Sequence, residues 1–297
     1  MKKLIVFAFI GLVAQLIDGS LGMAYGLTST SLLLVFGISP AIASASVHLS
    51  ELATTAASGI AHFRFGNVDK QVVKTLIIPG SIGAFVGACF LSNLPGDLVK
   101  PYISIFLLAL GVYIVYRFLF NRAQTKATRQ PYSKRFLYPL GLFAGFLDAT
   151  GGGGWGPFTT PVLLSRTSME PRKVIGSVDT SEFAIASAAT LGFLISLGTS
   201  GFNWLWIGAL TLGGIIAAPI AAWLVKVLPS YLLGVLVGGL IIFTNLRNLV
   251  DVSKGLDSTT KTYIYALVLS LWAACIAFAV WKKWNEGSSI HQVENDA

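Results

Sequence analysis

The sequence is poor in charged residues. Only 11% of its 297 residues are Asp, Glu, Lys or Arg, whereas a soluble domain carries about 25%. Hydrophobic residues make up 54% of the chain, and they form long runs between the few charges. This composition excludes a soluble globular domain and indicates a protein that crosses a membrane several times.

Cysteine is scarce as well. Cys89 and Cys275 lie in apolar runs without neighbouring ligand residues, which argues against a metal site or a disulfide. The chain has no Ser-His-Asp arrangement, no Cys/His metal spacing and no Walker motif, so we expect no enzyme, no cofactor and no use of ATP by this chain alone. The net charge of +8 comes from short basic loops without interleaved aromatic residues, so no nucleic-acid partner is expected.

Long apolar runs are what the sequence has in abundance. Seven of them reach the length of about 20 residues that a membrane span needs. These runs are 41–63, 72–94, 101–120, 174–197, 203–228, 231–250 and 262–281. Two further pairs of runs are short and interrupted, namely 4–17 with 23–37 and 136–147 with 157–165. The expected fold is an all-α integral membrane protein with about seven to nine crossings.

The two halves of the chain resemble each other. IGLVAQLIDGSLGMAYG (10–26) aligns without gaps to LGLFAGFLDATGGGGWG (140–156), and SVHLSEL (46–52) aligns to SVDTSEF (177–183). The pattern predicts four regions. They are a first membrane repeat (1–120), a basic connector (121–135), a second membrane repeat (136–250), and an extra helix with a polar tail (251–297).

The number of crossings in each half decides how the halves are related. In both halves an interrupted pair precedes three full spans, so the copies are inverted if that pair crosses zero or two times and parallel if it crosses once. The loop after the second interrupted pair carries Arg166, Arg172 and Lys173, which indicates that it lies in the cytoplasm, as the basic connector before the pair does. This requires an even number of crossings for the pair. Lys2 and Lys3 then face outside. We expect two inverted-topology repeats with interrupted helices and a cytoplasmic C-terminus.

The interruption in the second half reads FLDATGGGGWGPF (146–158). It fits G-x-G-x-x-G formally, but dinucleotide binding requires a preceding strand, which the apolar flanks exclude. Unwound backbone at membrane depth is tolerated where it is buried in protein or lines a cavity, and a helix N-terminus favours an anion. The alternative interpretation is close helix packing through small residues. We predict a substrate site at both breaks. Its expected residues are Gly22, Tyr25, Gly26, Gly151, Gly152, Gly153, Gly154 and Trp155.

Ionisable side chains inside apolar runs are costly and usually functional. His48 and Glu51 share one helix face, and Asp179 and Glu182 repeat that spacing. Histidine changes charge near neutral pH and neighbouring acids can share a proton, so Glu51 and Glu182 are candidates for proton coupling. The alternative is that these groups satisfy freed backbone amides or sit near water. The substrate-binding candidates of these segments are Ser46, His48, Ser50, Ser177, Asp179 and Ser181.

Five further polar residues are weaker candidates. They are Gln15, Asp18, Asp148, Asn245 and Arg247. For Asp18 and Asp148 we favour capping of the next half-helix over ligand contact. For Arg247 we favour an interfacial side chain that reaches water over pairing with a substrate.

The glycine segment, its second copy, the S-V-x-x-S-E segments and the HFRFGNVD loop resemble the sulfite exporter family TauE/SafE over about residues 4–250. The resemblance implies a multi-pass protein of the bacterial inner (plasma) membrane. It also implies transport of sulfur-containing anions such as sulfite, thiosulfate, sulfoacetate or organosulfonates. The first copy, GSLGMAYG, is poorer in glycine, and His48 stands where the second copy has Asp179, so the identity of the anion stays open.

These observations predict a secondary transporter that works by alternating access, with proton coupling as an option. The alternative is a membrane channel for small anions, which would need a ring of similar polar groups and no coupled proton. A membrane scaffold without flux would leave the duplicated breaks unexplained. The expected partners are a small sulfur oxyanion or organosulfonate and the lipid bilayer, and a homodimer is left open.

Overall fold

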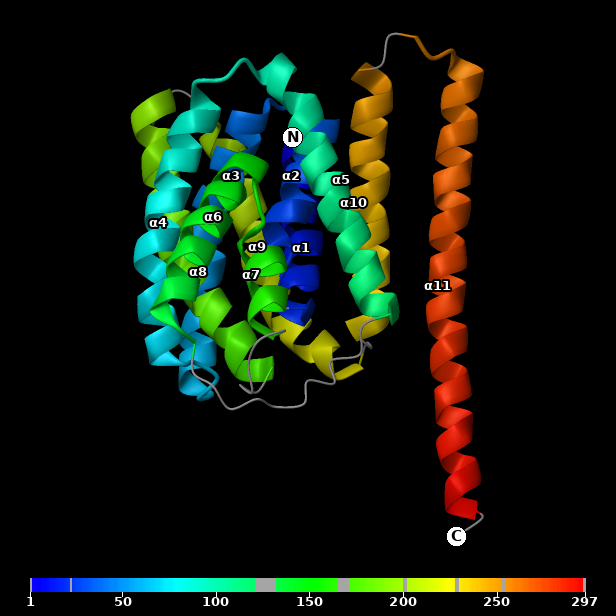
Figure 1. Ribbon diagram of the computed structural model, residues 1–297. Helices are drawn as coiled ribbons and strands as arrows, with labels where there is room; N and C mark the ends of the chain where they lie inside the picture. Colours follow the sequence, from blue (N-terminus) through cyan, green and yellow to red (C-terminus); the bar gives the residue numbers. More distant parts are fainter. Residues whose placement is uncertain are drawn as a thin grey trace.

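The computed structural model describes residues 2–21, 23–120, 132–164, 171–199, 202–227, 230–252 and 255–295. These residues form helices and no strands, which confirms the all-α fold for the part of the chain that is described (Figure 1). The helices of the first half are α1 (Lys2–Leu21), α2 (Tyr25–Val35), α3 (Pro40–Arg64), α4 (Lys70–Ser92) and α5 (Gly96–Phe120). Those of the remainder are α6 (Lys134–Gly151), α7 (Trp155–Leu164), α8 (Pro171–Leu197), α9 (Trp204–Val227), α10 (Ser230–Val252) and α11 (Ser258–Asn295).

Five segments are long and apolar enough to cross a membrane. They are Lys70–Ser92, Gly96–Phe120, Lys173–Leu197, Gly234–Asp251 and Ser258–Lys282. They match five of the seven expected runs. The run 41–63 forms the long helix α3 but is not among them, since it carries His48, Glu51 and many hydroxyls. For α9 the apolar stretch found is the shorter Trp204–Ala217. The total number of crossings therefore stays a prediction.

The helices of the two halves are interleaved. Helix α1 packs along α9, α6 packs along α4, α3 packs on α8 and α5 packs on α10. Small residues allow these close crossings: a Cβ atom added at Gly213 would lie 2.8 Å from the Leu12 amide nitrogen, and one at Gly83 would lie 2.9 Å from that of Phe146. Each interrupted helix is thus held by a helix of the opposite half.

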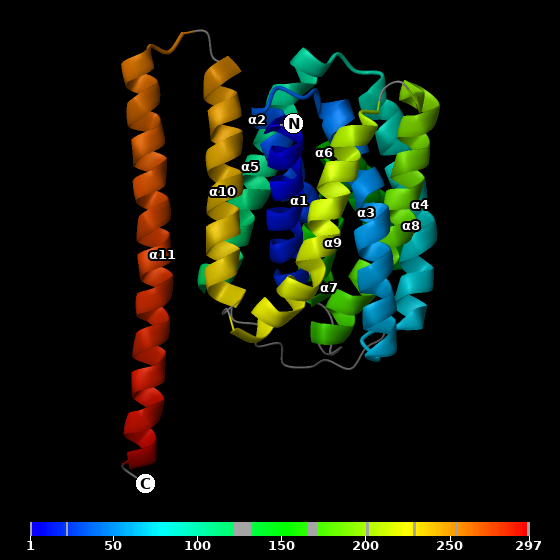
Figure 2. The same cartoon turned by 180° about the vertical axis from the view of Figure 1, so that it is seen from behind.

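The two interrupted pairs start from opposite ends of the bundle. In both views the start of α1 and the start of α3 lie at the upper end. Helix α1 therefore begins at this end, and helix α2, which precedes α3, returns to it. Helix α6 begins at the lower end, where α5 also ends, and helix α7 returns to that end (Figures 1 and 2). We call the end that holds Phe120 and Lys134 the connector side and the opposite end the far side.

Helix α11 stands apart from the bundle and packs mainly on α10 (Figure 2). It corresponds to the extra helix expected after the second half. Asp257 precedes it and accepts hydrogen bonds from the Thr260 hydroxyl at 2.5 Å and from the amides of Thr259 and Thr260. The hydrogen bonds from Thr260 hold the pKa of Asp257 below its ordinary value. Asp257 therefore caps the start of α11.

Candidate functional site

An aspartate closes each interruption between two half-helices. Asp148, near the end of α6, accepts a hydrogen bond at 3.0 Å from the amide of Trp155, the first residue of α7. Asp18 of α1 accepts the equivalent bond at 3.2 Å from the amide of Tyr25, which begins α2. A side-chain oxygen on a free N-terminal amide is a cap, and its negative charge faces the positive end of the half-helix. This is the contact that the capping interpretation predicts.

Backbone geometry explains the run of glycines. Gly152 and Gly153 have φ angles of 71° and 139°, in the region that glycine adopts without a steric penalty. In the first break the residue with a positive φ angle is Ala24, at 96°, and an alanine in this region is strained. The second break therefore needs its glycines for conformation. Gly22 lies outside the described residues.

The two breaks meet each other. A Cβ atom added at Gly26 would lie 2.5 Å from the Cα of Gly153, so the two backbones are in direct contact. The hydroxyl of Thr30 in α2 donates a hydrogen bond to the carbonyl oxygen of Gly152. The structure thus brings together segments that are more than a hundred residues apart, as the convergence of the two breaks requires.

The aromatic residue that begins each second half-helix is bonded to a serine. The indole nitrogen of Trp155 donates to the carbonyl oxygen of Val178 at 3.1 Å and to the hydroxyl of Ser181 at 3.2 Å. The hydroxyl of Tyr25 is hydrogen-bonded to that of Ser50, which aligns with Ser181. Both aromatic side chains are buried. Ser50 and Ser181 therefore bind the aromatic side chain that begins each second half-helix, and in this way they help to position that half-helix.

His48 forms a buried pair with Asp148. The Nε2 atom of His48 lies 3.1 Å from Oδ2 of Asp148, and Nδ1 lies 2.8 Å from the carbonyl oxygen of Ser44. The two side chains are 0% and 2% exposed. Both ring nitrogens face acceptors, and only the imidazolium can donate from both. The geometry therefore describes an ion pair that joins α3 to the second break.

Carboxylates surround this pair. Glu51 lies against the first break, since a Cβ atom added at Gly26 would lie 3.1 Å from its Oε1 atom. Glu51 interacts electrostatically with His48 and Asp148, and Glu182 interacts with Glu51. The buried or partly buried acids of the cluster are Asp18, Glu51, Asp148, Asp179 and Glu182. An unpaired buried charge is costly, so the acids that His48 does not pair are candidates for proton binding.

Two of the predicted serines serve local structure. Ser46 donates to the carbonyl oxygen of Ile42 in its own helix at 2.7 Å. Ser177 accepts a bond at 2.8 Å from the amide of Asp69, which holds the loop between α3 and α4 against α8. Neither hydrogen bond involves a break.

The weaker candidates separate into buried and exposed residues. Asn245 of α10 donates to the Ser31 hydroxyl of α2 at 2.8 Å, and Gln15 is buried with its side-chain oxygen unpaired among the described residues. Arg247 instead lies 3.7 Å from Asp251, with both side chains about half exposed. Arg247 therefore pairs with an exposed acid of its own helix and reaches water, as the interfacial interpretation predicts.

Sequence reasoning missed a set of hydroxyls on the two short half-helices. Thr28 and Ser29 of α2, and Thr159 and Thr160 of α7, are buried without a hydrogen-bond partner for their side chains among the described residues. Buried hydroxyls are normally paired, so these four are available to a ligand. The signal was present in the hydroxyl-rich segments YGLTSTS and PFTTP.

Arg117 was missed as well. Its Nη1 atom lies 3.6 Å from the sulfur of Met23, which belongs to the first break. It is partly buried near the end of α5, on the connector side. Arg117 therefore brings a cation to a break. Sequence patterns identify Arg117 only as a basic residue near the end of an apolar run.

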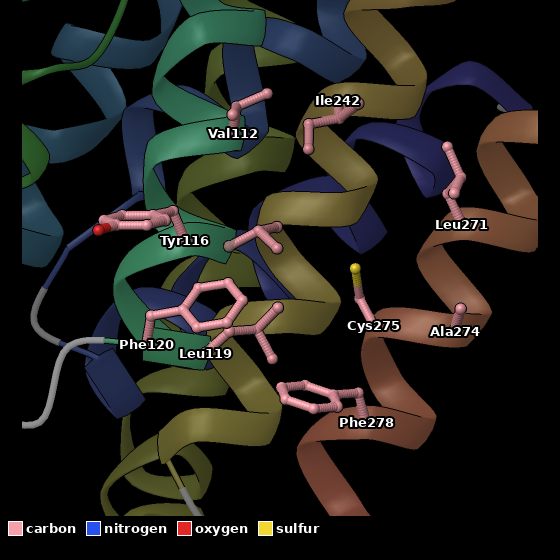
Figure 3. A pocket seen from close by; sticks show the side chains of 10 residues that line it. Val112, Tyr116, Leu119, Phe120, Ile242, Leu271, Ala274, Cys275 and Phe278 are labelled. Carbon is pink, nitrogen blue, oxygen red and sulfur yellow. The ribbon is translucent and has the colours of Figure 1, made fainter.

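Two surface grooves are unsuited to an anion. One has a volume of about 430 Å³ and lies between α5, α10 and α11, where Leu119 and Phe120 point toward Cys275 and Phe278 (Figure 3). The other, of about 630 Å³, lies between α4 and α6. Apolar side chains dominate both linings, which suits lipid contact. The polar, buried region at the breaks is therefore the stronger candidate site.

The chain matches the family described as "Sulfite exporter TauE/SafE" over residues 7–248. The chain belongs to this family. It is 61% identical over 286 residues to "Probable membrane transporter protein YtnM" of Bacillus subtilis (strain 168), which covers 96% of this chain and 95% of the relative. It is 27% identical over 192 residues to "Probable membrane transporter protein YdhB" of the same organism, covering 62% of this chain and 75% of the relative. No solved structure matches.

The TauE/SafE match confirms the resemblance seen in the sequence. It spans both breaks and ends before α11. The family and the names of the relatives indicate a membrane transporter rather than an enzyme. Together with the five apolar helices, they indicate a protein that crosses the membrane several times.

Proposed function

We propose that the protein is a secondary transporter of small sulfur-containing oxyanions in the bacterial plasma membrane. Sulfite, thiosulfate, sulfoacetate and organosulfonates are the substrates in question. The observation that carries the proposal is the contact between Gly26 and Gly153, where two helix breaks meet inside a cluster of titratable side chains. The description of the family supports a sulfur oxyanion.

The anion would be bound by hydroxyls and backbone amides at the start of α2 and α7. The first amide of each half-helix is taken by Asp18 or Asp148, so a substrate uses the amides that follow. The unpaired hydroxyls of α2 and α7 provide further donors. Arg117 supplies positive charge at the connector side of the first break.

The helix arrangement supports inverted repeats. Helix α1 packs on α9 as α6 packs on α4, and the two interrupted pairs start from opposite ends of the bundle. Because the two breaks touch, a substrate reaches them only when one group of helices moves away from the other. This is alternating access, in which one repeat rocks against the other.

The distribution of basic residues supports a cytoplasmic connector side. Described basic residues at the helix ends on that side are Arg64, Lys70, Lys74, Lys134, Arg135 and Lys173. Those at the far side are fewer and include Lys100 and Lys261. The end of helix α11 also lies toward the connector side (Figure 1).

Proton coupling follows from the excess of acids. An anion that approaches Glu51 and Glu182 is repelled while they are ionised. A proton bound to either carboxylate removes that repulsion, so proton and anion binding favour each other, and this coupling is reciprocal.

Flux measurements on the purified protein in liposomes test the proposal. The panel contains sulfite, thiosulfate, sulfoacetate and toluenesulfonate, each with and without a pH gradient, and protein-free liposomes are the control. We expect saturable flux of at least one sulfur anion that responds to the gradient. Absence of flux for the whole panel contradicts the proposal, and flux that neither saturates nor responds to the gradient supports the channel alternative.

A further inference from the structure

His62 connects the surface of the connector side with a buried carboxylate. It lies in the last turn of α3, and its Nε2 atom is 3.9 Å from Oδ2 of Asp179 in α8. The His62 side chain is 26% exposed, whereas that of Asp179 is 5% exposed. Within the described residues, neither Nδ1 of His62 nor Oδ2 of Asp179 has a hydrogen-bond partner. The pair is therefore close, partly accessible to water and free to bind or release a proton.

The loop HFRFGNVD fixes His62 in this position. The amide of Asn67 donates to the carbonyl oxygen of His62 at 3.0 Å, and the amide of Asp69 donates to Ser177 at 2.8 Å. A Cβ atom added at Gly176 would lie 2.9 Å from Nδ1 of His62, so the loop packs tightly on α8. The loop thus presses the imidazole against the segment that carries Asp179.

Further carboxylates lie behind Asp179. It also contacts the Ser58 hydroxyl, and it interacts electrostatically with Asp18 of α1 and Glu182 of its own helix. Asp18 in turn interacts with Glu51, which lies against the first break. Beyond Glu51 stand His48 and Asp148, the paired groups of the second break. A series of titratable side chains, each of which interacts with the next, therefore extends from His62 at the surface to both breaks.

The opposite half of the bundle is closed at the equivalent position. The alignment of SVHLSEL with SVDTSEF extends to the helix starts Pro40 and Pro171, so His48 corresponds to Asp179 and Phe193 corresponds to His62. The rings of His48 and Phe193 lie 6.1 Å apart, and Phe193 is fully buried. The second half therefore has the buried, apolar ring of Phe193 at the position where the first half has the titratable, water-accessible ring of His62.

We infer that His62 and Asp179 form the access point through which protons reach the buried carboxylates from the connector side. This inference rests on the proposed function and adds the route and the side of proton access. In the transfer step an N–H bond of the His62 imidazolium breaks and an O–H bond on Asp179 forms. The imidazole then takes a new proton from water. Since 3.9 Å exceeds hydrogen-bond length, the ring must move closer for the transfer.

The test compares His62→Gln and Asp179→Asn with the control Arg64→Gln, which changes another polar residue in the same exposed turn. Inside-out membrane vesicles present the connector side to the medium, whose pH is varied while the internal pH is fixed. The probes are the four anions of the panel above, namely sulfite, thiosulfate, sulfoacetate and toluenesulfonate. A pH-sensitive dye reports proton movement, and exchange of labelled for unlabelled anion reports transport without net proton transfer.

For His62→Gln and Asp179→Asn we expect substrate-coupled proton movement to fall about tenfold or more, within the usual range of coupling effects. Anion exchange should persist in His62→Gln, and Arg64→Gln should behave like the wild type. If the wild type moves none of the four anions, the proposed function fails. If it moves an anion without protons, the inference fails while transport stands. The inference alone fails if His62→Gln keeps full coupling, or if it loses exchange and coupling together, which indicates a structural role.

Discussion

The backbones of Gly26 and Gly153 are in contact where the two interrupted helices meet, with 2.5 Å between a Cβ atom added at Gly26 and the Cα of Gly153. Any side chain at either position would push the two half-helices apart. The contact also closes the space between the breaks, so passage of a substrate requires the breaks to separate. The glycines are therefore needed for both conformation and approach.

Replacement of Gly153 by alanine tests this contact. The residue has φ 139°, so the variant combines backbone strain of about 1–3 kcal/mol with a steric clash. We expect anion flux to be abolished while the protein is still inserted into the membrane. The control is Gly208→Ala in α9, where nothing lies within 4 Å of the added Cβ atom and flux should be unchanged. Normal flux in Gly153→Ala contradicts a role for the breaks.

The His48–Asp148 pair predicts a stability effect. His48→Gln leaves the buried Asp148 carboxylate without its ionic partner, which costs about 3–5 kcal/mol. Unfolding of the detergent-solubilised protein should show this loss. His48→Gln combined with Asp148→Asn should cost less than the sum of the two single changes. The exposed pair gives the comparison: Asp251→Asn should cost at most about 1 kcal/mol. Equal stability of all these variants contradicts the buried ion pair.

Arg117 should affect affinity for the anion. A hydrogen bond to a charged group is worth about 1.5–3 kcal/mol, so Arg117→Gln should raise the KM for sulfite about tenfold or more. Arg117→Lys should recover part of the affinity. Lys100→Gln, a charge removal near the other end of α5, is the matched control. Concentration-dependent uptake measures the effect, and an unchanged KM in Arg117→Gln places this cation outside the substrate route.

Membrane topology can be tested by labelling single cysteines in a variant without Cys89 and Cys275. Lys126→Cys in the connector and Phe65→Cys in the exposed loop after α3 should resist an impermeant reagent added outside intact cells. Asp97→Cys, at the exposed start of α5 on the far side, should be labelled. Labelling of position 126 from outside refutes the proposed orientation.

Sequence patterns revealed the breaks and their caps because these depend on local rules. An aspartate seven residues before an aromatic residue, with glycines between them, is readable in the chain at Asp148 and Trp155. Partners across the bundle were not readable. The bond of His48 to Asp148 spans one hundred residues, and only packing of α3 against α6 creates it. Ser177 was predicted at the substrate, but it receives its hydrogen bond from the amide of Asp69, which is 108 residues away in the sequence.

The prediction that the run 41–63 spans the membrane stays untested, because the helix there is more polar than the five apolar helices. Helix α3 has the length of a span, yet it carries His48, Glu51 and several buried hydroxyls, because its face lines the region between the breaks. His62 belongs to the HFRFGNVD segment, which the sequence analysis describes as a loop, whereas the structure places it in the last turn of α3. Its contact with Asp179 depends on how α3 crosses α8, which no local pattern reports.

We propose that Glu51 and Glu182 couple protons to anion transport at the breaks. The most direct measurement is sulfite flux into proteoliposomes as a function of the pH gradient, for the wild type, Glu182→Gln, Glu51→Gln and the exposed control Asp251→Asn. Glutamine mimics the protonated carboxyl group. We expect both glutamine variants to exchange sulfite while their net flux no longer responds to the pH gradient. The net flux of the wild type and of Asp251→Asn should respond to the gradient alike. Wild-type dependence on the gradient in both glutamine variants would contradict it.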